Sequence, residues 1–561
     1  MSWEEFEQHP HTIVGVIEKW AKKTPDKVAL IIYDTGRQIT YKEFHEIITT
    51  MSFKLYNMGF RKGDILVTSL PFLYEHIVLG YACAKLGVMW TPLDLRLKPP
   101  EIMRALNLLK DKAKLYCHLG KTPVANFGMI GSAVRKTLPW LQYVVQFSTP
   151  DDKYRNGIIP AYQIAEEAAN EITRAVGDPE SMKEFREECS KVGENDPILI
   201  IFTTGSTGFP KPAMITNLGI TCQNMCLSKG IDVEEDDIML VNLPPSHVGG
   251  TTEQLMTTLF RGGTCVILHI FDAAKTLDAI QKYKVTVFGQ IPALFVLEWR
   301  LPNYQDFDLS SLKYAIYGGQ SVDRPFLEKL VSMAPKFGSG LGLTESSGFC
   351  TYTPLDGTVD DILAGLGHDY PIYPMTVRAP MKEDGSAGEE LPDGEIGEIC
   401  FKGPQTFVGY FNNEEATRNT ISTDQHLYTG DMGYKDSSGL HLAGRRKFII
   451  KPKGYQVFPP DVEAFIAELP QVEFVAAVGA KHKIFTEGIA VYIKVKEGNS
   501  LSEQEVFDHC KGMAAYKRPS MIVFLDEFPL NRVAKTDYVA LRARVEEDVK
   551  KARTNGGWDT E

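Results

Sequence analysis

The stretch ILIIFTTGSTGFPKP, residues 198–212, determines how the rest of the chain is interpreted. Its first five residues are a continuous apolar run, which is typical of a strand buried on both faces of a sheet. The next ten, residues 203–212, hold two glycines, four hydroxyl side chains, two prolines and one lysine. Glycine and proline interrupt regular structure, so this composition predicts a loop. Its N–H and O–H donors, with the charge of Lys211, are suited to phosphate oxygens.

The loop taken alone leaves two interpretations open. It lacks the G-x-x-x-x-G-K-[ST] spacing of a Walker loop, so an ordinary surface turn with an incidental lysine is the alternative. The following segments favour a ligand site. Four further apolar runs predict strands of a mostly parallel sheet together with 198–202, at 237–241, 264–268, 285–288 and 314–317.

Small and polar residues follow the predicted strands, in the segments NLPPSHVGG, GQIP, GGQ and GLTESSG. In open α/β sheets, ligands bind beyond the carboxyl ends of the strands. Glu345 would ordinarily be a solvated carboxylate, and His247 a hydrogen-bonded histidine near a core. At a phosphate site, Glu345 with Thr344 beside it predicts a magnesium site, because Mg²⁺ prefers one or two carboxylates plus phosphate oxygens.

The length of 561 residues favours two to four domains, and a formal net charge of −12 argues against broad attraction to nucleic acid. The nine cysteines include no Cys-x-x-Cys pair, which favours reduced, buried thiols. The amino terminus is acidic, unlike a secretory signal, and the most apolar stretch, 76–93, is interrupted by Lys85. We therefore expect a cytoplasmic protein without a membrane span or nucleic-acid partner. The charged stretch 166–196 is expected to be a surface connection.

Five ordered motifs resemble the adenylate-forming enzymes, a family that includes acyl-CoA synthetases, firefly-type luciferases and peptide-synthetase adenylation domains. The resemblance covers nearly the whole chain, and five motifs in order are a far stronger signal than any one of them. They correspond to the family's phosphate loop, its adenine and magnesium motif, its ribose motif, its hinge with the loop beyond, and its carboxy-terminal lysine motif. In this chain they are TTGSTGFPKP (203–212), LGLTE (341–345), YTGD (428–431), GRRKFIIKPKGYQVFPPDVE (444–463) and NRVAKTD (531–537).

The resemblance implies an α/β fold with a large N-terminal domain and a smaller, mobile α+β C-terminal domain. The N-terminal domain is expected to consist of two packed α/β sheet subdomains plus a small distorted β-barrel. The expected boundaries are residues 1–446 for the N-terminal core and 447–561 for the C-terminal domain. Within the core, the three parts are expected at about 1–195, 196–378 and 379–446.

The resemblance also implies an ATP-dependent, AMP-forming ligase with Mg²⁺ as its cofactor. A carboxylate attacks the α-phosphate of ATP and releases pyrophosphate, and a thiol then attacks the acyl-adenylate and releases AMP. The catalytic residues it implies are Lys535, His247, Thr344 and Glu345, of which Glu345 and Thr344 also hold the metal. The residues it implies at ATP and AMP are Thr203, Thr204, Ser206, Thr207, Lys211, Gly318, Gly319, Gln320, Ser339, Leu341, Gly342, Thr344, Asp431, Arg445 and Lys535.

Three positions depart from the family's pattern. Pro212 stands where glycine is usual, which removes one N–H donor and restricts φ. Leu341 stands where an aromatic side chain usually stacks on adenine, and Ala534 replaces the glycine before the carboxy-terminal lysine. The charged residues Asp431, Glu345 and Lys535 are all present, which argues against an inactive relative.

The chain has no Gly-Gly-x-Ser carrier-attachment motif after its last domain, so coenzyme A is the expected thiol. The alternatives are an adenylation enzyme that loads a carrier protein and a nucleotide-binding sensor without catalysis. For the thioester step the resemblance implies Lys451, Gly454 and Tyr455, and it implies Lys447 as the hinge. A side chain at position 454 would obstruct the path of the thiol.

For the acid, amino-acid-activating members of the family that this chain resembles usually have an aspartate at PPSHVGG to hold the substrate ammonium group; this chain has none there, which argues against an amino acid. The residues expected to line the acyl pocket are His247, Val248, Gly249, Gly289, Gly318, Gly342 and Leu343. We expect a neutral monocarboxylate of moderate bulk, cyclic or aromatic first and a medium-chain fatty acid second. Two points stay open: whether the reaction runs toward the thioester or in reverse toward ATP, and whether the protein is a monomer or a homodimer.

Overall fold

The computed structural model describes residues 2–122, 125–148, 152–203, 210–452, 455–484, 486–530, 536–554 and 558. These residues divide into two compact units. The first holds the described residues of Met1–Thr204, Pro210–Met375 and Phe401–Leu427, and the second holds those of Thr376–Cys400 and Tyr428–Glu561. Thr204, Ser206, Thr207, Gly454 and Lys535, which the sequence predicts at the site, lie outside the described residues.

The first unit contains a seven-stranded sheet in the order β14-β13-β12-β10-β11-β1-β2. All neighbours in it are parallel except the edge pair of β1 and β2. Its strands are β1 (Val28–Ile32), β2 (Gln38–Thr40), β10 (Ile238–Val241), β11 (Thr264–Ile267), β12 (Val287–Gln290), β13 (Tyr314–Tyr317) and β14 (Lys336–Gly338). Four of the five apolar runs predicted for one parallel sheet are therefore found together.

The fifth run, residues 198–202, lies in a different sheet. This eight-stranded sheet has the order β19-β9-β8-β4-β3-β5-β6-β7. Its strands are β3 (Ile65–Ser69), β4 (Met89–Pro92), β5 (Ala113–Leu119), β6 (Tyr143–Phe147), β7 (Ile159–Pro160), β8 (Pro197–Phe202), β9 (Pro212–Thr216) and β19 (Gly409–Tyr410). The expectation of one sheet is wrong here because β8 turns back into the antiparallel β9 and pairs with β4 on its other side.

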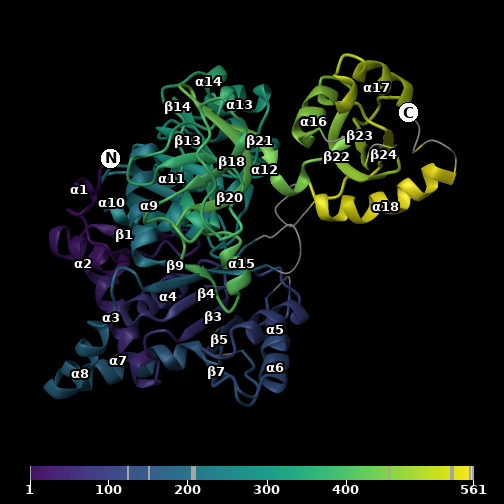
Figure 1. Ribbon diagram of the computed structural model, residues 1–561. Coiled ribbons are helices and arrows are strands. Elements are labelled where there is room, and N and C mark those ends of the chain that lie inside the picture. The colour runs from purple at the N-terminus through teal and green to yellow at the C-terminus, as the bar shows by residue number, and fades with distance from the viewer. Residues whose placement is uncertain are drawn as a thin grey trace. The chain divides into compact units, whose positions relative to one another are not determined.

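The helices of the first unit flank both sheets (Figure 1). They are α1 (Trp3–Phe6), α2 (Ile13–Lys23), α3 (Tyr41–Asn57), α4 (Tyr74–Leu86), α5 (Pro99–Leu108), α6 (Phe127–Thr137), α7 (Ala161–Val176), α8 (Pro179–Cys189), α9 (Asn217–Gly230), α10 (Thr257–Arg261), α11 (Ala273–Tyr283), α12 (Pro292–Trp299), α13 (Arg324–Val331), α14 (Val359–Ala364) and α15 (Glu414–Arg418). The first unit also contains a π-helix, 3₁₀ turns and two short strands. These are η1 (Gly249–Met256), η2 (Tyr304–Asp306), η3 (Thr344–Ser346), β15 (Gly342–Leu343) and β16 (Gly348–Phe349).

The charged stretch 166–196, expected to be a surface connection, forms most of α7 and all of α8. Charged residues cover the exposed faces of these helices, while Phe185 is buried and packs edge-on against Phe53 with ring centroids 5.2 Å apart. A few apolar residues on one face are enough to attach an otherwise polar helix.

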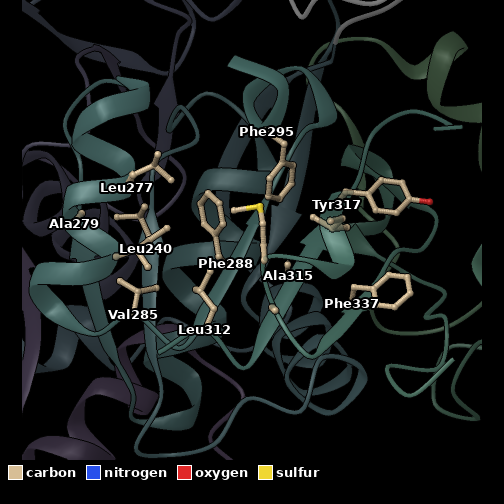
Figure 2. Close-up of a cluster of buried hydrophobic side chains, with 14 of the residues drawn as sticks. Leu240, Leu277, Ala279, Val285, Phe288, Phe295, Leu312, Ala315, Tyr317 and Phe337 are labelled. Atoms are coloured by element: carbon tan, nitrogen blue, oxygen red, sulfur yellow. The ribbon is translucent and has the colours of Figure 1, made fainter. Parts of the chain in front are cut away.

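The core of the seven-stranded sheet holds the ends of its strands in place. Phe288 of β12 and Phe295 of α12 pack at 5.2 Å between ring centroids, with Leu240 of β10 and Ala315 of β13 in the same buried cluster (Figure 2). Burying each large apolar side chain contributes about 1.5–3 kcal/mol. The loops that follow β10, β12 and β13 therefore start from fixed positions.

The second unit holds two smaller sheets. A four-stranded sheet has the order β17 (Met375–Arg378), β18 (Gly397–Phe401), β20 (Leu427–Asp436), β21 (Gly439–Arg445). A three-stranded sheet has the order β22 (Val472–His482), β23 (Thr486–Val495), β24 (Met521–Phe524). The remaining elements of the second unit are α16 (Pro459–Ala467), α17 (Glu503–Cys510), α18 (Tyr538–Thr554) and the 3₁₀ turns η4 (Arg446–Phe448) and η6 (Ala515–Lys517).

Successive residues of β22 and β23 face opposite sides of the three-stranded sheet, as the period of a strand requires. Ala477 and Val491 belong to the cluster beneath α16 and α17, whereas Ala476 and Tyr492 belong to the cluster beneath α18. Figure 1 shows α18 on the side away from α16. Among the described helices of both units, none has the length and apolar character needed to cross a bilayer.

Candidate functional site

Two hydrogen bonds between Thr203 and Lys211 close the base of the predicted phosphate loop, at the end of the β8–β9 hairpin. The Thr203 N–H donates to the Lys211 carbonyl oxygen at 2.9 Å, and the Lys211 N–H donates to Thr203 Oγ1 at 3.4 Å. Pro212 begins β9 opposite Phe202. A proline is tolerated at the first residue of a strand. The loop thus leaves and re-enters the sheet at adjacent positions.

The lysine of this loop and the predicted magnesium ligand meet at Tyr410, which is buried in β19. The Lys211 ammonium lies over the Tyr410 ring, 4.9 Å from its centroid. The Tyr410 hydroxyl donates to Glu345 Oε1 at 2.6 Å. Burial and then the Glu345 carboxylate raise the pKa of Tyr410 far above its ordinary range, so the phenol stays protonated and remains a donor.

Glu345 and Thr344 occupy the 3₁₀ turn η3. The Phe407 N–H donates to the Glu345 carbonyl oxygen at 2.9 Å, and the Ser347 N–H to that of Thr344 at 3.0 Å. Within the part of the chain that the structure describes, there is no group of three histidine, cysteine or acidic side chains arranged to hold a metal. The donors at η3 fit Mg²⁺, which is commonly held by one carboxylate together with phosphate oxygens and water.

The segment predicted to line the acyl pocket begins the π-helix η1. Thr251 fixes its first turn, because the Thr251 N–H donates to the His247 carbonyl oxygen at 3.1 Å and its hydroxyl to that of Pro245 at 2.7 Å. Thr252 Oγ1 donates to the carbonyl oxygen of Val248 at 3.0 Å. π-Helices are rare and are found frequently at functional sites.

His247 is half-buried and lies near Asp94, which follows β4. Asp94 binds Arg96 at 2.6 Å. Burial favours a higher Asp94 pKa, but the Arg96 hydrogen bonds and the nearby His247 hold that pKa below its ordinary value. Asp94 and Arg96 were missed at the sequence level, since they lie far from His247 along the chain.

A buried polar network attaches η1 to the ends of β10 and β12. Gln254 Nε2 donates to the Gly289 carbonyl oxygen at 2.6 Å and to Asn242 Oδ1 at 3.0 Å. Asn242 Nδ2 donates to Gln290 Oε1 at 2.8 Å, and Gln290 Nε2 donates to Glu298 Oε2 at 2.9 Å. Burial raises the Glu298 pKa to about 8. Asn242, Gly289 and Gln290 lie in segments that follow predicted strands, whereas nothing in the sequence marked Gln254 or Glu298.

The remaining residues predicted in this unit occupy turns and strands near these groups. Gly318 approaches Phe349 so closely that a β-carbon would lie 2.9 Å from its ring, and Gly319 adopts a φ of +90°. Gly342 lies opposite Phe349 in the β15–β16 pair, where a β-carbon would lie 3.2 Å from its backbone. Ser339 and Leu341 are buried, Leu343 is half-buried, and Gln320 is exposed.

In the second unit, the predicted ribose ligand Asp431 is buried in β20 and faces Arg445 across the ladder with β21. Arg445 Nε lies 2.6 Å from Asp431 Oδ1. This ion pair orients the carboxylate, and the half-exposed guanidinium adds positive charge beside it. The prediction that these two residues lie together is therefore reproduced by the structure.

A second carboxylate beneath Asp431 escaped the sequence analysis. Glu398 of β18 is buried, accepts a hydrogen bond from the Gly430 N–H at 2.9 Å and binds Arg446 at 2.7 Å. Burial raises the Glu398 pKa, although Arg446 opposes the rise. Glu398 thus fixes the backbone immediately before Asp431, and only the sheet pairing brings it there.

The predicted hinge, Lys447, lies in the 3₁₀ turn η4 with its ammonium 5.1 Å from the Phe448 ring centroid. Tyr455, predicted for the thioester step, is 56% exposed and stacks on Tyr516 at 4.6 Å between ring centroids. Lys451 is exposed, and its N–H donates to Glu487 Oε2 at 2.5 Å.

Comparison with known proteins assigns the chain to a family. Residues 17–411 match the model described as AMP-binding enzyme, and residues 461–535 match the AMP-binding enzyme C-terminal domain. The chain therefore belongs to the AMP-binding enzyme family, within the adenylate-forming superfamily that includes the acyl-CoA synthetases. This confirms the predicted family, fold class and type of enzyme, an AMP-forming acyl-CoA synthetase.

Similar proteins align over nearly the whole chain. The chain is 27% identical to 4-coumarate–CoA ligase 4 of Arabidopsis thaliana over 91% of this chain and 87% of that protein. It is 24% identical to medium-chain acyl-CoA ligase ACSF2 of Bos taurus over 96% and 88% of the two chains. The structure of ATP-bound MatB from Rhodopseudomonas palustris shares the fold with a TM-score of 0.76 at 22% identity, covering 95% of this chain and 99% of that one.

We expect Gly250→Ala to destabilise the protein and Gly249→Ala, its matched control, to be tolerated. A β-carbon on Gly250 would lie 2.5 Å and 2.6 Å from the carbonyl oxygens of Leu243 and Pro244, whereas on Gly249 its nearest neighbour is the Leu243 Cδ1 atom at 3.0 Å. Overpacking of this kind costs about 1–3 kcal/mol. Thermal denaturation should show a lower Tm for Gly250→Ala only, and equal Tm values would contradict this geometry.

Proposed function

We propose that this AMP-forming acyl-CoA synthetase activates a neutral monocarboxylate of moderate bulk with ATP and transfers the acyl group to coenzyme A. The observation that carries the proposal is the cluster of Lys211, Tyr410 and Glu345, in which a phosphate-loop ammonium and an acidic metal ligand share one buried phenol. A cation and a metal-binding carboxylate held together at a glycine- and hydroxyl-rich loop are the groups that a nucleoside triphosphate requires.

In the first half-reaction two anions must approach each other, so positive charge and N–H donors have to offset their repulsion. Lys211 and the loop donors Thr203, Thr204, Ser206 and Thr207 hold the β- and γ-phosphates. Bound Mg²⁺ supplies further charge neutralisation, and Glu345 with the Thr344 hydroxyl would hold it. Tyr410 orients the Glu345 carboxylate through its hydrogen bond.

The other motifs supply the remaining groups for adenylation. Asp431, oriented by Arg445, accepts hydrogen bonds from the ribose hydroxyls. Lys535 neutralises charge at the carboxylate and the α-phosphate. Gly318, Gly319, Gln320, Ser339, Leu341 and Gly342 contact the adenine and its surroundings.

In the second half-reaction the thiol of coenzyme A attacks the acyl carbon and AMP leaves. Gly454 leaves space for the thiol, with Lys451 and Tyr455 beside that path. Because Lys535 and Gly454 belong to the same small domain and serve successive steps, that domain rotates about Lys447. This places the domain boundary between residues 446 and 447.

The acid is recognised by His247, Val248, Gly249, Gly289, Gly318, Gly342 and Leu343. Cyclic or aromatic acids are the first class and medium-chain fatty acids the second, in line with relatives named for 4-coumarate and for medium-chain acyl groups. The protein is proposed to act in the cytoplasm, and the same site can run in reverse to make ATP.

An AMP-release screen tests the proposal directly. The purified protein is incubated with ATP, Mg²⁺, coenzyme A and a panel of benzoate, cyclohexane carboxylates and C2 to C12 fatty acids. Carboxylate-dependent release of pyrophosphate and AMP with formation of the thioester supports it. ATP binding without pyrophosphate release identifies a nucleotide sensor, and acyl transfer to a purified carrier protein but not to coenzyme A identifies a carrier-loading enzyme.

We expect Glu345→Gln to bind ATP but to adenylate slowly, with a loss of roughly 10²–10³ in rate. Tyr410→Phe keeps the carboxylate and removes one hydrogen bond, so its loss is expected to be smaller, about tenfold. The measurement is carboxylate-dependent pyrophosphate release across a magnesium titration. Near-normal rates for Glu345→Gln at low magnesium would rule out its role as a metal ligand.

We expect Lys535→Ala and Lys447→Pro to fail in opposite half-reactions. Lys535→Ala should lose adenylation by roughly 10²–10³, yet convert supplied acyl-adenylate and coenzyme A into thioester. Lys447→Pro restricts φ at the hinge and should hamper rotation, so it keeps adenylation and loses thioester formation. Each half-reaction is assayed separately in both variants, and equal defects in the same half-reaction would refute the rotation.

A further inference from the structure

A chain of buried amides connects helix α12 to the predicted acyl pocket, and the backbone sets its direction. The Gln254 Oε1 atom accepts hydrogen bonds from the Asn242 and Leu243 N–H groups, each at 3.1 Å. The Gln254 Nε2 atom donates to the Gly289 carbonyl oxygen at 2.6 Å. A backbone N–H only donates and a carbonyl oxygen only accepts, so the Gln254 amide has one permitted orientation.

This orientation fixes the amides that follow. Gln254 Nε2 also donates to Asn242 Oδ1 at 3.0 Å, so the other end of the Asn242 amide, Nδ2, donates to Gln290 Oε1 at 2.8 Å. The other end of the Gln290 amide, Nε2, then donates to Glu298 Oε2 at 2.9 Å. All four side chains are buried. They form a one-way chain of hydrogen bonds, which we name the amide relay, and Glu298 is its final acceptor.

The amide relay fixes two backbone segments beside the predicted acyl pocket. One is Gly289, which is expected to line that pocket and whose carbonyl oxygen Gln254 binds. The other is the turn at Leu243, against which η1 packs so closely that a β-carbon on Gly250 would lie 2.5 Å from the Leu243 carbonyl oxygen. Rotation of the Gln254 amide would break both attachments, so the shape of the pocket depends on a complete relay.

Glu298 occupies a position that would otherwise suit an apolar residue. Its side chain is fully buried on α12, and Phe295 of the same helix packs into the apolar cluster of the seven-stranded sheet (Figure 2). Glutamate is rarely buried to this extent unless it is paired. An apolar side chain at position 298 would leave Gln290 Nε2 as a buried donor without an acceptor, which is costly. The carboxyl group therefore serves to end the relay.

The charged groups near α12 are directed elsewhere. Tyr304 of η2 lies close enough for the Glu298 charge to raise its pKa, and the Lys329 ammonium lies over the Tyr304 ring, 5.1 Å from its centroid. On α11, which packs against α12, Asp278 accepts a hydrogen bond from the Tyr33 hydroxyl at 2.8 Å.

Burial keeps the Glu298 carboxyl neutral near pH 7. It raises the Glu298 pKa to about 8, the Gln290 hydrogen bond opposes the rise, and no cation of the described residues contributes. Above about pH 8 the carboxylate would stand in the core with one donor and no counter-ion, which is unfavourable.

We propose that Glu298 is a positioning residue for the acid, because as the final acceptor of the amide relay it holds Gly289 and the Leu243 turn in the arrangement that binds the substrate. Glu298 acts through three other side chains and takes no part in the chemistry. This inference rests on the proposed function, whose acyl pocket it supports from outside. Loss of the relay is expected to raise KM for the acid with little change in kcat, because bound acid still meets an intact phosphate site.

The test compares Glu298→Leu, which removes the acceptor, with Glu298→Gln, which retains it. The probe acids are benzoate, cyclohexanecarboxylate and octanoate, with pyrophosphate release as the readout and hydroxylamine in place of coenzyme A as the acyl acceptor. We expect KM for each adenylated acid to rise about tenfold in Glu298→Leu, the effect of one unpaired buried donor, with kcat and KM for ATP within about twofold of wild type. Glu298→Gln should keep the wild-type KM at pH 7. Equal KM values in the two variants would overturn the proposal.

A matched control separates positioning from stability. Phe295→Leu shortens a core side chain on the same helix that takes no part in the relay, so it should lower Tm and leave KM for the acid unchanged. If Phe295→Leu raises KM as much as Glu298→Leu does, loss of stability explains both and the positioning role is refuted.

A double variant tests whether the relay acts as a unit. Gln254→Met breaks it at the other end, so Gln254→Met combined with Glu298→Leu should raise KM no further than Gln254→Met alone. If the two increases in KM multiply, the two residues act independently and the relay is refuted.

The pH profile of KM tests the carboxyl group directly, between about pH 7 and about pH 9. Because the Glu298 pKa is raised, its contribution is present below about pH 8 and is lost as the pH rises through that value. Wild-type KM for the acid should therefore rise above about pH 8, whereas Glu298→Gln, which cannot ionise, should show no such rise. Parallel profiles would overturn the proposal. This comparison decides the question if the leucine and methionine variants do not fold.

The outcomes separate this inference from the function on which it rests. If none of the probe acids gives pyrophosphate release with the wild-type protein, the proposed function fails, and the positioning role fails with it. If the wild type adenylates an acid and Glu298→Leu does so with the same KM, the proposed function stands and only the positioning role is refuted.

Discussion

The buried phenol of Tyr410 contacts both charged groups of the predicted phosphate site, Lys211 and Glu345. Tyr410 presents its ring face to the Lys211 ammonium and its hydroxyl to the Glu345 carboxylate. A free lysine and glutamate near one phosphate chain would attract each other directly and reduce the charge available to a ligand. Because Tyr410 lies on β19, which pairs with β9 of the loop hairpin, the position of that phenol depends on the order of strands in the eight-stranded sheet.

A second constraint acts at the π-helix. The Gln254 side chain binds the Gly289 carbonyl oxygen and the Asn242 and Leu243 amides, which ties the start of the pocket to two core strands. Buried polar groups of this kind are costly unless they are paired, so the network favours one arrangement of the helix. The residue before it, Glu253, packs against Gly249 and Gly348 instead, so both sides of η1 are held by the residues around it.

Much of the candidate site was predictable because its residues lie in short contiguous motifs. Thr203 and Lys211 close the predicted loop, and Glu345, which its motif singled out, lies in the 3₁₀ turn η3. Asp431 and Arg445, which are close in sequence, pair across a local hairpin. In each case the partners are neighbours along the chain or across one turn, where local composition is informative.

The residues that sequence analysis missed come together only through long-range packing. Tyr410 reaches Glu345 from a distant strand, and Glu398 reaches the backbone before Asp431 through pairing of β18 with β20. Glu253 and Gln223 converge on Gly348 from two helices. A single carboxylate, amide or phenol in a sequence is ordinary, and no local pattern marks the one that will be buried beside a ligand.

The amino-acid sequence by itself indicated the family, the apolar strands and the motifs proposed to bind phosphate, magnesium and ribose, because these follow from local composition and spacing. The tertiary structure alone decided that β8 joins the sheet of β4 rather than that of β10, and that Glu253 and Gln223 pack against Gly348. The physical reason is that strand order and the pairing of buried polar atoms depend on which distant segments bury each other's surface. Several segments could pack together, and only the packing of the whole chain selects one arrangement.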